Sequence, residues 1–320
     1  MPSAPSSRVL TVAVAQMGPI ARSETRTQAV ERLISLMEES HGLGAKFVVF
    51  PELALTTFFP RWVIDDEEEL DSYFETSMPN NETQPLFERA RELGCGFHLG
   101  YAELVRDDAG KKTYFNTAIL VDDTGAITGK YRKIHLPGTA KTVAGAPHQH
   151  LEKRYFEVGD LGFPVFQSQG GVMGMCICND RRWPETWRML GLQGAELVAL
   201  GYNTPHVNPF ATAEPVFLGM FHNHLSMQAG AYQNGTWVVA SAKAGVEEGV
   251  HHMGGSCIIA PTGEIVALCH TEGDEVAVAQ CDLSMGDYIK QNIFNFEAHR
   301  RIEHYGLITS QTGMKRPDGV

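Results

Sequence analysis

The chain has 320 residues, of which 43% are hydrophobic and 20% are charged, so it can bury a sizeable core. Its 38 acidic and 26 basic side chains give a formal net charge of -12, which repels nucleic acids, and no dense run of Lys and Arg overrides that field. Because no segment has the apolar length of a membrane span and residues 1–8 are polar, we expect a cytoplasmic protein that binds neither membrane nor nucleic acid.

The first half of the chain alternates between β-branched apolar runs and helical patterns. Strands are predicted at residues 8–16, 46–51 and 96–105, and a hairpin of strands 114–121 and 126–134 turns at residues 122–125. Helices are predicted at residues 84–93 and 25–37, the second opened by a capping box between Thr25 and Gln28. The acidic run at residues 65–69 indicates a solvated helix start.

The second half is also rich in strands. Strands are predicted at residues 172–178, 196–202, 237–243 and 275–283, with a hairpin over 256–268 that turns at 261–263. Helices are predicted from Pro184 onward and at residues 215–232. Strands outnumber helices without a strict βαβ rhythm, which favours two packed sheets with helices outside. We expect one domain over residues 1–320, with an extended tail from about residue 305.

Cysteine and histidine spacing argues against a metal site. None of the six cysteines forms a C-x-x-C pair, and no two histidines have the i, i+4 spacing of a helical metal pair. We therefore expect reduced thiols, no metal and no cofactor.

Three predicted strands lead into an ionisable side chain beside turn-forming residues: Glu52, Lys133 and Cys178. Strand ends that open into loops are where α/β enzymes hold reactive groups rigidly. Cleavage of an amide needs a nucleophile, a proton carrier and a group that stabilises the oxyanion, and these three residue types can supply them. Lys133 and a following helix N-terminus are expected to lower the thiol pKa of Cys178.

Each of the three also has a structural interpretation. Cys178 can be a small buried hydrophobic residue, as we expect for Cys176 on the same strand. Glu52 can be a cap or a surface charge, and Lys133 can belong to a solvated basic strand face. The chemistry of the residues alone does not decide between these alternatives.

Longer segments carry a resemblance. FPELALTTFFP around Glu52, YRKIHLPG around Lys133 and ICNDRRWPETWR around Cys178 resemble the carbon–nitrogen hydrolases of the nitrilase superfamily, and N-carbamoyl-D-amino acid amidohydrolases (D-carbamoylases) most of all. The segments HLEKRYFEVGDLGFPV, GYNTP, LSMQAGAYQNG, APTGEIVAL and IFNFEAHR extend the resemblance over nearly the whole chain.

The resemblance implies an α/β fold, a four-layer α-β-β-α sandwich that assembles into homodimers or homotetramers. It implies that Cys178 is the nucleophile, Glu52 the general base and Lys133 the group that stabilises the oxyanion. Glu152 matches a second glutamate that positions these groups, although it can instead be a buried partner of Lys153 or Arg154. The remaining matches are two histidines that organise hydrogen bonds near the site, His135 and His150.

Two adjacent arginines, Arg181 and Arg182, follow the expected nucleophile. A guanidinium grips a carboxylate bidentately, and an N-carbamoyl amino acid carries a carboxylate near its scissile bond. The alternative for either arginine is a surface ion pair with Asp180 or Glu185. Further candidate donors to the substrate, each of which can instead be part of a turn, are Asn179, Asn203 and Thr204.

These features predict hydrolysis of N-carbamoyl-D-amino acids to D-amino acids, carbon dioxide and ammonia. The D preference follows from the resemblance alone. Another amidase, a nitrilase or a β-ureidopropionase-like hydrolase is the alternative, and a catalytically silent binding protein is a more distant one. Residues 139–147 are smaller than the D-carbamoylase pattern and are expected to border the substrate entrance.

Overall fold

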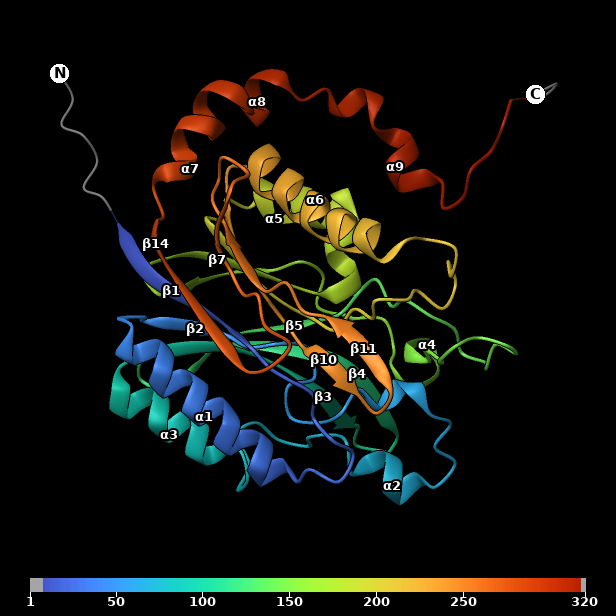
Figure 1. Cartoon of the computed structure of the whole chain (residues 1–320). Helices are drawn as coiled ribbons and strands as arrows, with labels where there is room; N and C mark the ends of the chain where they lie inside the picture. Colours follow the sequence, from blue (N-terminus) through green and yellow to red (C-terminus); the bar gives the residue numbers. More distant parts are fainter. Residues whose placement is uncertain (1–7, 318–320) are drawn as a thin grey trace.

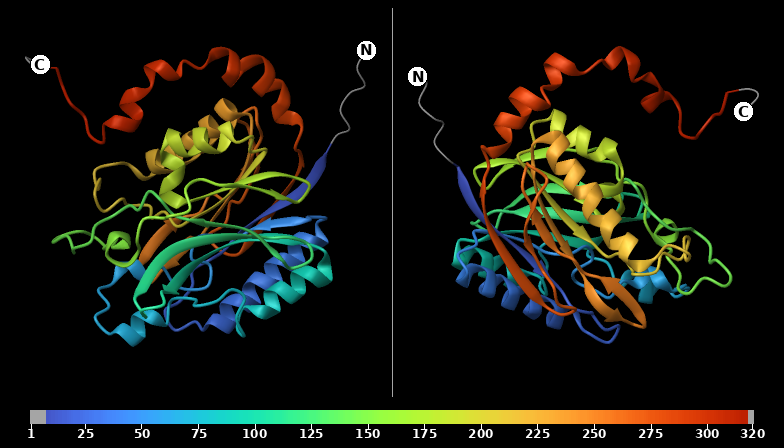
Figure 2. Two further views of the ribbon diagram at one scale, coloured as in Figure 1. Left: turned by 180° about the vertical axis from the view of Figure 1, so that it is seen from behind. Right: turned by 45° about the horizontal axis from the view of Figure 1, so that its top comes forward.

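Two six-stranded β-sheets pack face to face in the middle of the molecule, with helices on both outer faces (Figure 1). The computed structural model describes residues 8–317. The same four layers are visible from behind in Figure 2. This arrangement is the predicted α-β-β-α sandwich.

The first sheet has the strand order β14-β1-β2-β3-β4-β5. β1 is parallel to β2 and antiparallel to β14, while β3, β4 and β5 are antiparallel neighbours. The bounds are β1 Val9–Gln16, β2 Phe47–Val49, β3 Gly96–Arg106, β4 Lys112–Val121, β5 Ile127–Arg132 and β14 Glu275–Asp282.

The second sheet has the order β13-β12-β9-β8-β7-β6, with a parallel centre and antiparallel edges. The bounds are β6 Val165–Ser168, β7 Gly171–Ile177, β8 Leu197–Tyr202, β9 Trp237–Ala242, β12 Cys257–Ile259 and β13 Ile265–Leu268. β6 and a separate hairpin of β10 (Ala244–Glu247) and β11 (Val250–Met253) lack a clear sequence signal and were not predicted.

The outer layers are helices. Helix α1 (Arg26–Gly42) and α3 (Gln84–Leu93) cover the first sheet, and α5 (Pro184–Leu192) and α6 (Val216–Asn234) cover the second (Figure 1). The predicted capping box of Thr25 and Gln28 opens α1. Shorter helical segments are α2 Glu67–Asp71, α4 Glu152–Tyr155, α7 Met285–Tyr288, α8 Phe296–His299 and α9 Gly306–Ser310, with 3-10 turns at Phe59–Arg61, Cys178–Arg182 and Ile302–His304 and a π-helical turn at Ile289–Ile293.

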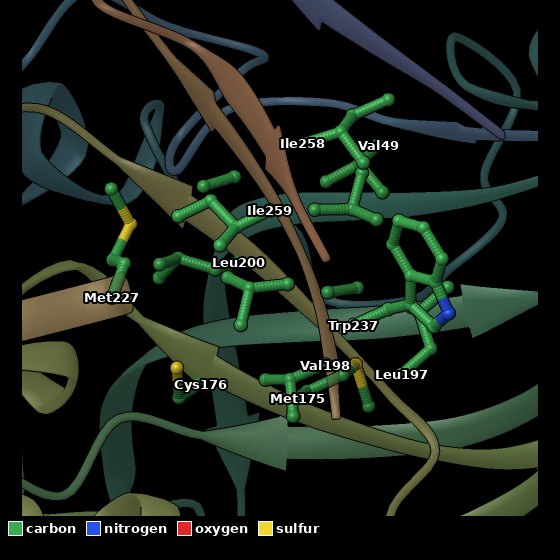
Figure 3. Close-up of a cluster of buried hydrophobic side chains, with 14 of the residues drawn as sticks. Val49, Met175, Cys176, Leu197, Val198, Leu200, Met227, Trp237, Ile258 and Ile259 are labelled. Carbon is green, nitrogen blue, oxygen red and sulfur yellow. The ribbon is translucent and has the colours of Figure 1, made fainter. Parts of the chain in front are cut away.

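Strand alternation divides the apolar residues between two cores. On β1, Val12 and Val14 face the second sheet, whereas Ala13 and Ala15 face α1 and α3, because successive side chains point to opposite faces. Figure 3 shows part of the cluster around the second sheet, where Ile258 lies near Val49 of the first sheet and Leu200 lies toward Met227 of α6 on the opposite face. Burial of β1 on both faces explains its continuous apolar sequence.

The end of the chain departs from the prediction of an extended tail. Residues 306–310 form α9, in which the hydroxyls of Thr309 and Ser310 donate to Gly306 O. Backbone hydrogen bonds such as Gln311 N–H to Leu307 O (3.2 Å) replace the bonds to water that an extended tail would make. The segment from α7 to α9 arches over α5 and α6 (Figure 1). Among residues 8–317, no helix is both long and apolar enough to span a membrane.

Candidate active site

Cys178 follows the last residue of β7 and begins a 3-10 turn. Its φ is 48°, a left-handed conformation that a residue with a side chain seldom adopts. Such strain persists only where surrounding contacts impose it, and it concentrates at functional sites. Cys178 is 5% exposed and lines a pocket, whereas Cys176 is fully buried in the core, as predicted.

Glu52 lies between the two sheets, three residues beyond the end of β2. Its backbone passes so close to Gly100 on β3 and Gly201 on β8 that a Cβ on either glycine would lie 2.8 Å or 2.4 Å from a Glu52 backbone atom. Only glycine permits this approach. The fully buried carboxylate accepts hydrogen bonds from Asn116 Nδ2 (2.7 Å) and the Asn203 backbone N–H (3.0 Å).

Lys133 joins the two buried glutamates. Its Nζ lies 2.7 Å from Glu52 Oε1 and 2.6 Å from Glu152 Oε2, and all three side chains are buried completely. The second oxygen of Glu152 contacts His150 Nε2 at 2.8 Å. Glu152 therefore pairs with Lys133 and His150, not with its sequence neighbours Lys153 and Arg154.

The electrostatics of the buried groups keep the lysine charged and the thiol protonated. Burial alone lowers the pKa of Lys133, but Cys178, Glu152 and Glu52 outweigh burial and raise that pKa. Burial raises the pKa of Glu152, yet Lys133 and then His150 hold it below its ordinary value.

The predicted lowering of the Cys178 thiol pKa is wrong. Burial, followed by the Glu52 carboxylate, raises this pKa, and the cations Lys133 and Arg181 offset only part of the increase. The 3-10 turn Cys178–Arg182 separates Cys178 from the N-terminus of α5 at Pro184, which was expected to favour the thiolate. The surroundings of Cys178 therefore favour the thiol over the thiolate.

Arg181 is a fully buried structural residue. Its Nε donates to Asn223 Oδ1 (2.8 Å), its Nη1 to Cys178 O (2.6 Å) and its Nη2 to Thr204 Oγ1 (2.8 Å). The guanidinium also lies 4.5 Å from the centre of the Tyr202 ring. Arg181 thus supports the turn of the nucleophile from behind and does not pair with Asp180 or Glu185.

Arg182 points the other way and lines the pocket that contains Cys178. The charge of Arg181 beside it, and then desolvation, lower the pKa of Arg182 to about 10, although the residue keeps an exposed surface, so it remains charged at neutral pH. Within residues 8–317, the Arg182 side chain forms no hydrogen bond or ion pair with the protein. Other predicted site residues that line this pocket of about 160 Å³ are His150, Asn179, Asn203 and Thr204.

Asp180 organises the turn of the nucleophile, a role that the sequence did not reveal. One carboxylate oxygen accepts hydrogen bonds from Tyr131 OH (2.8 Å) and the Ile177 N–H (3.0 Å). The other oxygen contacts the backbone N–H and Nδ1 of His135. His135, predicted near the site, is therefore tied to Asp180, and its carbonyl accepts from Asn179 Nδ2 (3.0 Å).

Two further expectations concern the pocket surroundings. Residues 139–147 do not line the pocket, although Pro137 and His150 on either side of them do. An unpredicted carboxylate, Glu214, lines it together with an apolar wall that includes Phe210 and Met253.

Across residues 8–317 no group of three or more His, Cys, Asp or Glu side chains could hold a metal ion.

The assembled groups have the properties that acyl transfer from an amide requires. A thiol on a strained turn faces a pocket beside a buried carboxylate and a buried ammonium. These groups can serve as nucleophile, proton acceptor and oxyanion donor without a metal or cofactor.

Comparison with known proteins agrees with this chemistry. The carbon–nitrogen hydrolase family model matches residues 11–291. A nitrilase from Pyrococcus abyssi is 32% identical over 299 residues, which cover 92% of this chain and 98% of the relative. An N-carbamoylputrescine amidase from Arabidopsis thaliana is 31% identical over 303 residues, covering 90% of this chain and 91% of the relative.

A solved structure shows the same fold. The carbon–nitrogen hydrolase from Helicobacter pylori G27 superposes with a TM-score of 0.79 at 22% identity, covering 95% of this chain and 99% of that chain. The chain therefore belongs to the carbon–nitrogen hydrolase family of the nitrilase superfamily, and it is an enzyme that acts on carbon–nitrogen bonds.

Proposed function

We propose that the enzyme hydrolyses N-carbamoyl-D-amino acids to the D-amino acid, carbon dioxide and ammonia. The observation that carries this proposal is the charged Arg182 guanidinium, which lines the same pocket as Cys178 and has no protein partner among the described residues. An N-carbamoyl amino acid offers a carboxylate to that guanidinium and a ureido carbonyl to the thiol. The D configuration rests on the resemblance to D-carbamoylases.

In this mechanism Cys178 is the nucleophile and Glu52 the proton carrier. Because burial keeps Cys178 a thiol, its proton passes to Glu52 as sulfur attacks the ureido carbonyl. The Lys133 ammonium, held by Glu52 and Glu152, stabilises the negative oxygen of the tetrahedral intermediate.

The intermediate collapses when Glu52 returns the proton to the departing nitrogen, which leaves an acyl group on Cys178. Glu52 then accepts a proton from water, and the resulting hydroxide equivalent attacks the thioester-type carbon. Expulsion of the thiolate, which regains a proton from Glu52, restores the enzyme. Release of either nitrogen first leads, after hydrolysis and decarboxylation, to the same three products.

A second candidate is a ureido substrate with a cationic end, and Glu214 is the observation that favours it. Glu214 lines the pocket and has His222 Nδ1 as a neighbour at 2.6 Å. Its carboxylate can hold an ammonium group, and the amidase from Arabidopsis thaliana is named for carbamoylputrescine.

The first experiment measures ammonia release from matched N-carbamoyl-D- and N-carbamoyl-L-amino acids, with N-carbamoylputrescine as a third substrate. D-selective turnover that Cys178→Ala abolishes supports the first proposal. Preference for N-carbamoylputrescine favours the second candidate. If no ureido compound reacts, both fail, and nitriles and simple amides are the next substrates to test.

The carboxylate contact is tested with Arg182→Gln. Loss of a charge-assisted pair of hydrogen bonds is expected to reduce kcat/KM for N-carbamoyl amino acids by about 10- to 100-fold. Turnover of an N-carbamoyl alkylamine, which has no carboxylate, should change much less. The matched control is Arg188→Gln, because Arg188 lies over the Phe296 ring and does not line the Cys178 pocket. Equal loss for both substrates would contradict the assignment.

A further inference from the structure

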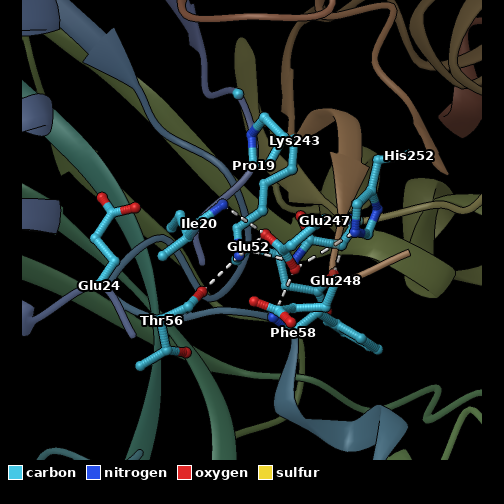
Figure 4. A network of polar contacts seen from close by, with 12 residues as sticks. Pro19, Ile20, Glu24, Glu52, Thr56, Phe58, Lys243, Glu247, Glu248 and His252 are labelled. Atoms are coloured by element: carbon cyan, nitrogen blue, oxygen red, sulfur yellow. Dashed lines mark hydrogen bonds and ion pairs between the residues drawn. The ribbon is translucent and has the colours of Figure 1, made fainter. Parts of the chain in front are cut away.

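A second buried ionic cluster lies directly behind the segment that carries Glu52 (Figure 4). Its members are Lys243, Glu247 and Arg61, and each has at most 6% of its surface exposed. Lys243 follows the last residue of β9, and Glu247 ends β10. None of the three lines the pocket of Cys178, so the mechanism above leaves them without a role.

The cluster forms hydrogen bonds to the backbone that follows Glu52. Lys243 Nζ donates to Thr56 O at 2.5 Å and lies 3.2 Å from Glu247 Oε2. Glu247 Oε1 accepts from the Phe58 N–H (2.7 Å), and Arg61 Nη1 donates to Glu247 O (2.7 Å). Residues 56–61 are therefore fastened to residues 243–247, which run from the end of β9 through β10.

The same segment reaches the second glutamate of the site. Pro60 O accepts from the Leu151 N–H at 2.7 Å, and Glu152 is the next residue. His252 completes the cluster: its Nε2 contacts Arg61 and lies 3.6 Å from Glu247 Oε1. One set of contacts thus connects the loops that carry both active-site carboxylates.

The charges of the two clusters are complementary. Glu52, Glu152 and Lys133 hold two carboxylates and one ammonium, which leaves a buried excess of one negative charge. The cluster behind holds two cations, Lys243 and Arg61, and one carboxylate. A buried net charge is costly unless an opposite charge lies near, and each cluster supplies what the other lacks.

We propose that Lys243 is a positioning residue that holds the segment carrying Glu52 and whose positive charge balances the negative charge of the active site. Glu247 offsets part of the positive charge of Lys243 and so weakens its electrostatic effect on Glu52. The charged and titratable groups that face Lys243 are Glu247, Arg61, Glu52 and His252. Burial, together with Arg61, lowers the pKa of Lys243, and the carboxylates of Glu247 and Glu52 offset only part of that effect, so the two clusters interact across the segment.

The inference rests on the proposed nucleophile, and its test needs no substrate. The measurement is the pH dependence of Cys178 alkylation by iodoacetamide, followed by mass spectrometry of the Cys178 peptide. Lys243→Met removes a cation and should move the midpoint to higher pH by about one unit, the effect of a unit charge at roughly 10 Å in a protein interior. Glu247→Gln removes an anion and should move the midpoint to lower pH.

The double variant Lys243→Met/Glu247→Gln removes one positive and one negative charge, so its alkylation midpoint should return close to that of the wild type. It keeps the proposal testable if one of the single variants folds poorly. Lys243→Arg should retain the wild-type midpoint. The matched control is Lys290→Met, since Lys290 Nζ also donates to a backbone carbonyl, Ala195 O at 2.9 Å, outside the active site.

A purely structural role for the cluster predicts lower unfolding temperatures without opposite shifts of the midpoint, and that result would overturn the proposal. Absence of ureido hydrolysis by wild-type enzyme would instead refute the proposed function and leave the alkylation result standing. The two failures are therefore distinguishable.

Discussion

Substitution of Gly201 by alanine tests whether the close approach of the two sheets positions Glu52, the proposed proton carrier. A Cβ at position 201 would lie 2.4 Å from Glu52 N, where an ordinary contact needs about 3.4 Å, so the Glu52 backbone must retreat by about 1 Å. A displacement of this size in an active site costs about 100-fold in rate, equivalent to about 2.7 kcal/mol of barrier. The added methyl group should also reduce the free energy of unfolding by about 1–3 kcal/mol.

The assay compares kcat for ammonia release by wild type, Gly201→Ala and Gly42→Ala, well below each unfolding temperature. Gly42 ends α1, and a Cβ there meets no atom within 4 Å, so its substitution should leave kcat unchanged. Wild-type kcat in Gly201→Ala would refute the argument. Equal losses in both variants would do the same, because they would show that activity does not depend on contact with Glu52.

Three further outcomes are expected. Glu152→Gln should lower kcat at least 10-fold with little change in KM. It should also destabilise the fold by about 3–5 kcal/mol, because buried Lys133 loses a charged partner. An unchanged kcat would show that Glu152 does not support the proposed catalytic groups. Burial lowers the pKa of His98 and of His252 to about 4, so stability is complete above about pH 6.5 and falls as the pH drops toward 4, by at most about 3 kcal/mol for each. Urea unfolding of His98→Leu should therefore show a shallower acid decline than wild type. The predicted dimer or tetramer should appear in analytical ultracentrifugation and dissociate in Phe221→Asp, since Phe221 is an exposed aromatic on α6; a wild-type monomer would contradict it.

Local sequence signals were sufficient for most of the elements. The apolar run of β1 and the capping box of α1 act over a few residues, so their physical basis is visible in a short window. The β10–β11 hairpin was missed because it pairs outside the two main sheets and has a mixed polar sequence. The helix α9 was missed because its five residues are too few to show a helical apolar period.

The site residues were identified with unequal success. Glu52 and Lys133 are 81 positions apart, and periodicity cannot bring them together; the resemblance suggested their grouping, and the structure places them 2.7 Å apart. Asp180 and Lys243 were missed, because a charged residue beside a strand has the same sequence appearance whether it is buried or solvated. Their burial depends on segments distant in sequence, such as the strand that carries Tyr131 and the loop that carries Thr56.

By itself, the sequence determined most of the strands and the longer helices, the acidic charge that argues against nucleic-acid binding, and the residue types available for amide chemistry. Only the tertiary structure distinguished the two neighbouring arginines. The 3-10 turn directs Arg181 into the protein interior and Arg182 into the pocket. The tertiary structure also decided the direction of the Cys178 pKa, because desolvation and the sum of surrounding charges depend on every segment packed around the thiol.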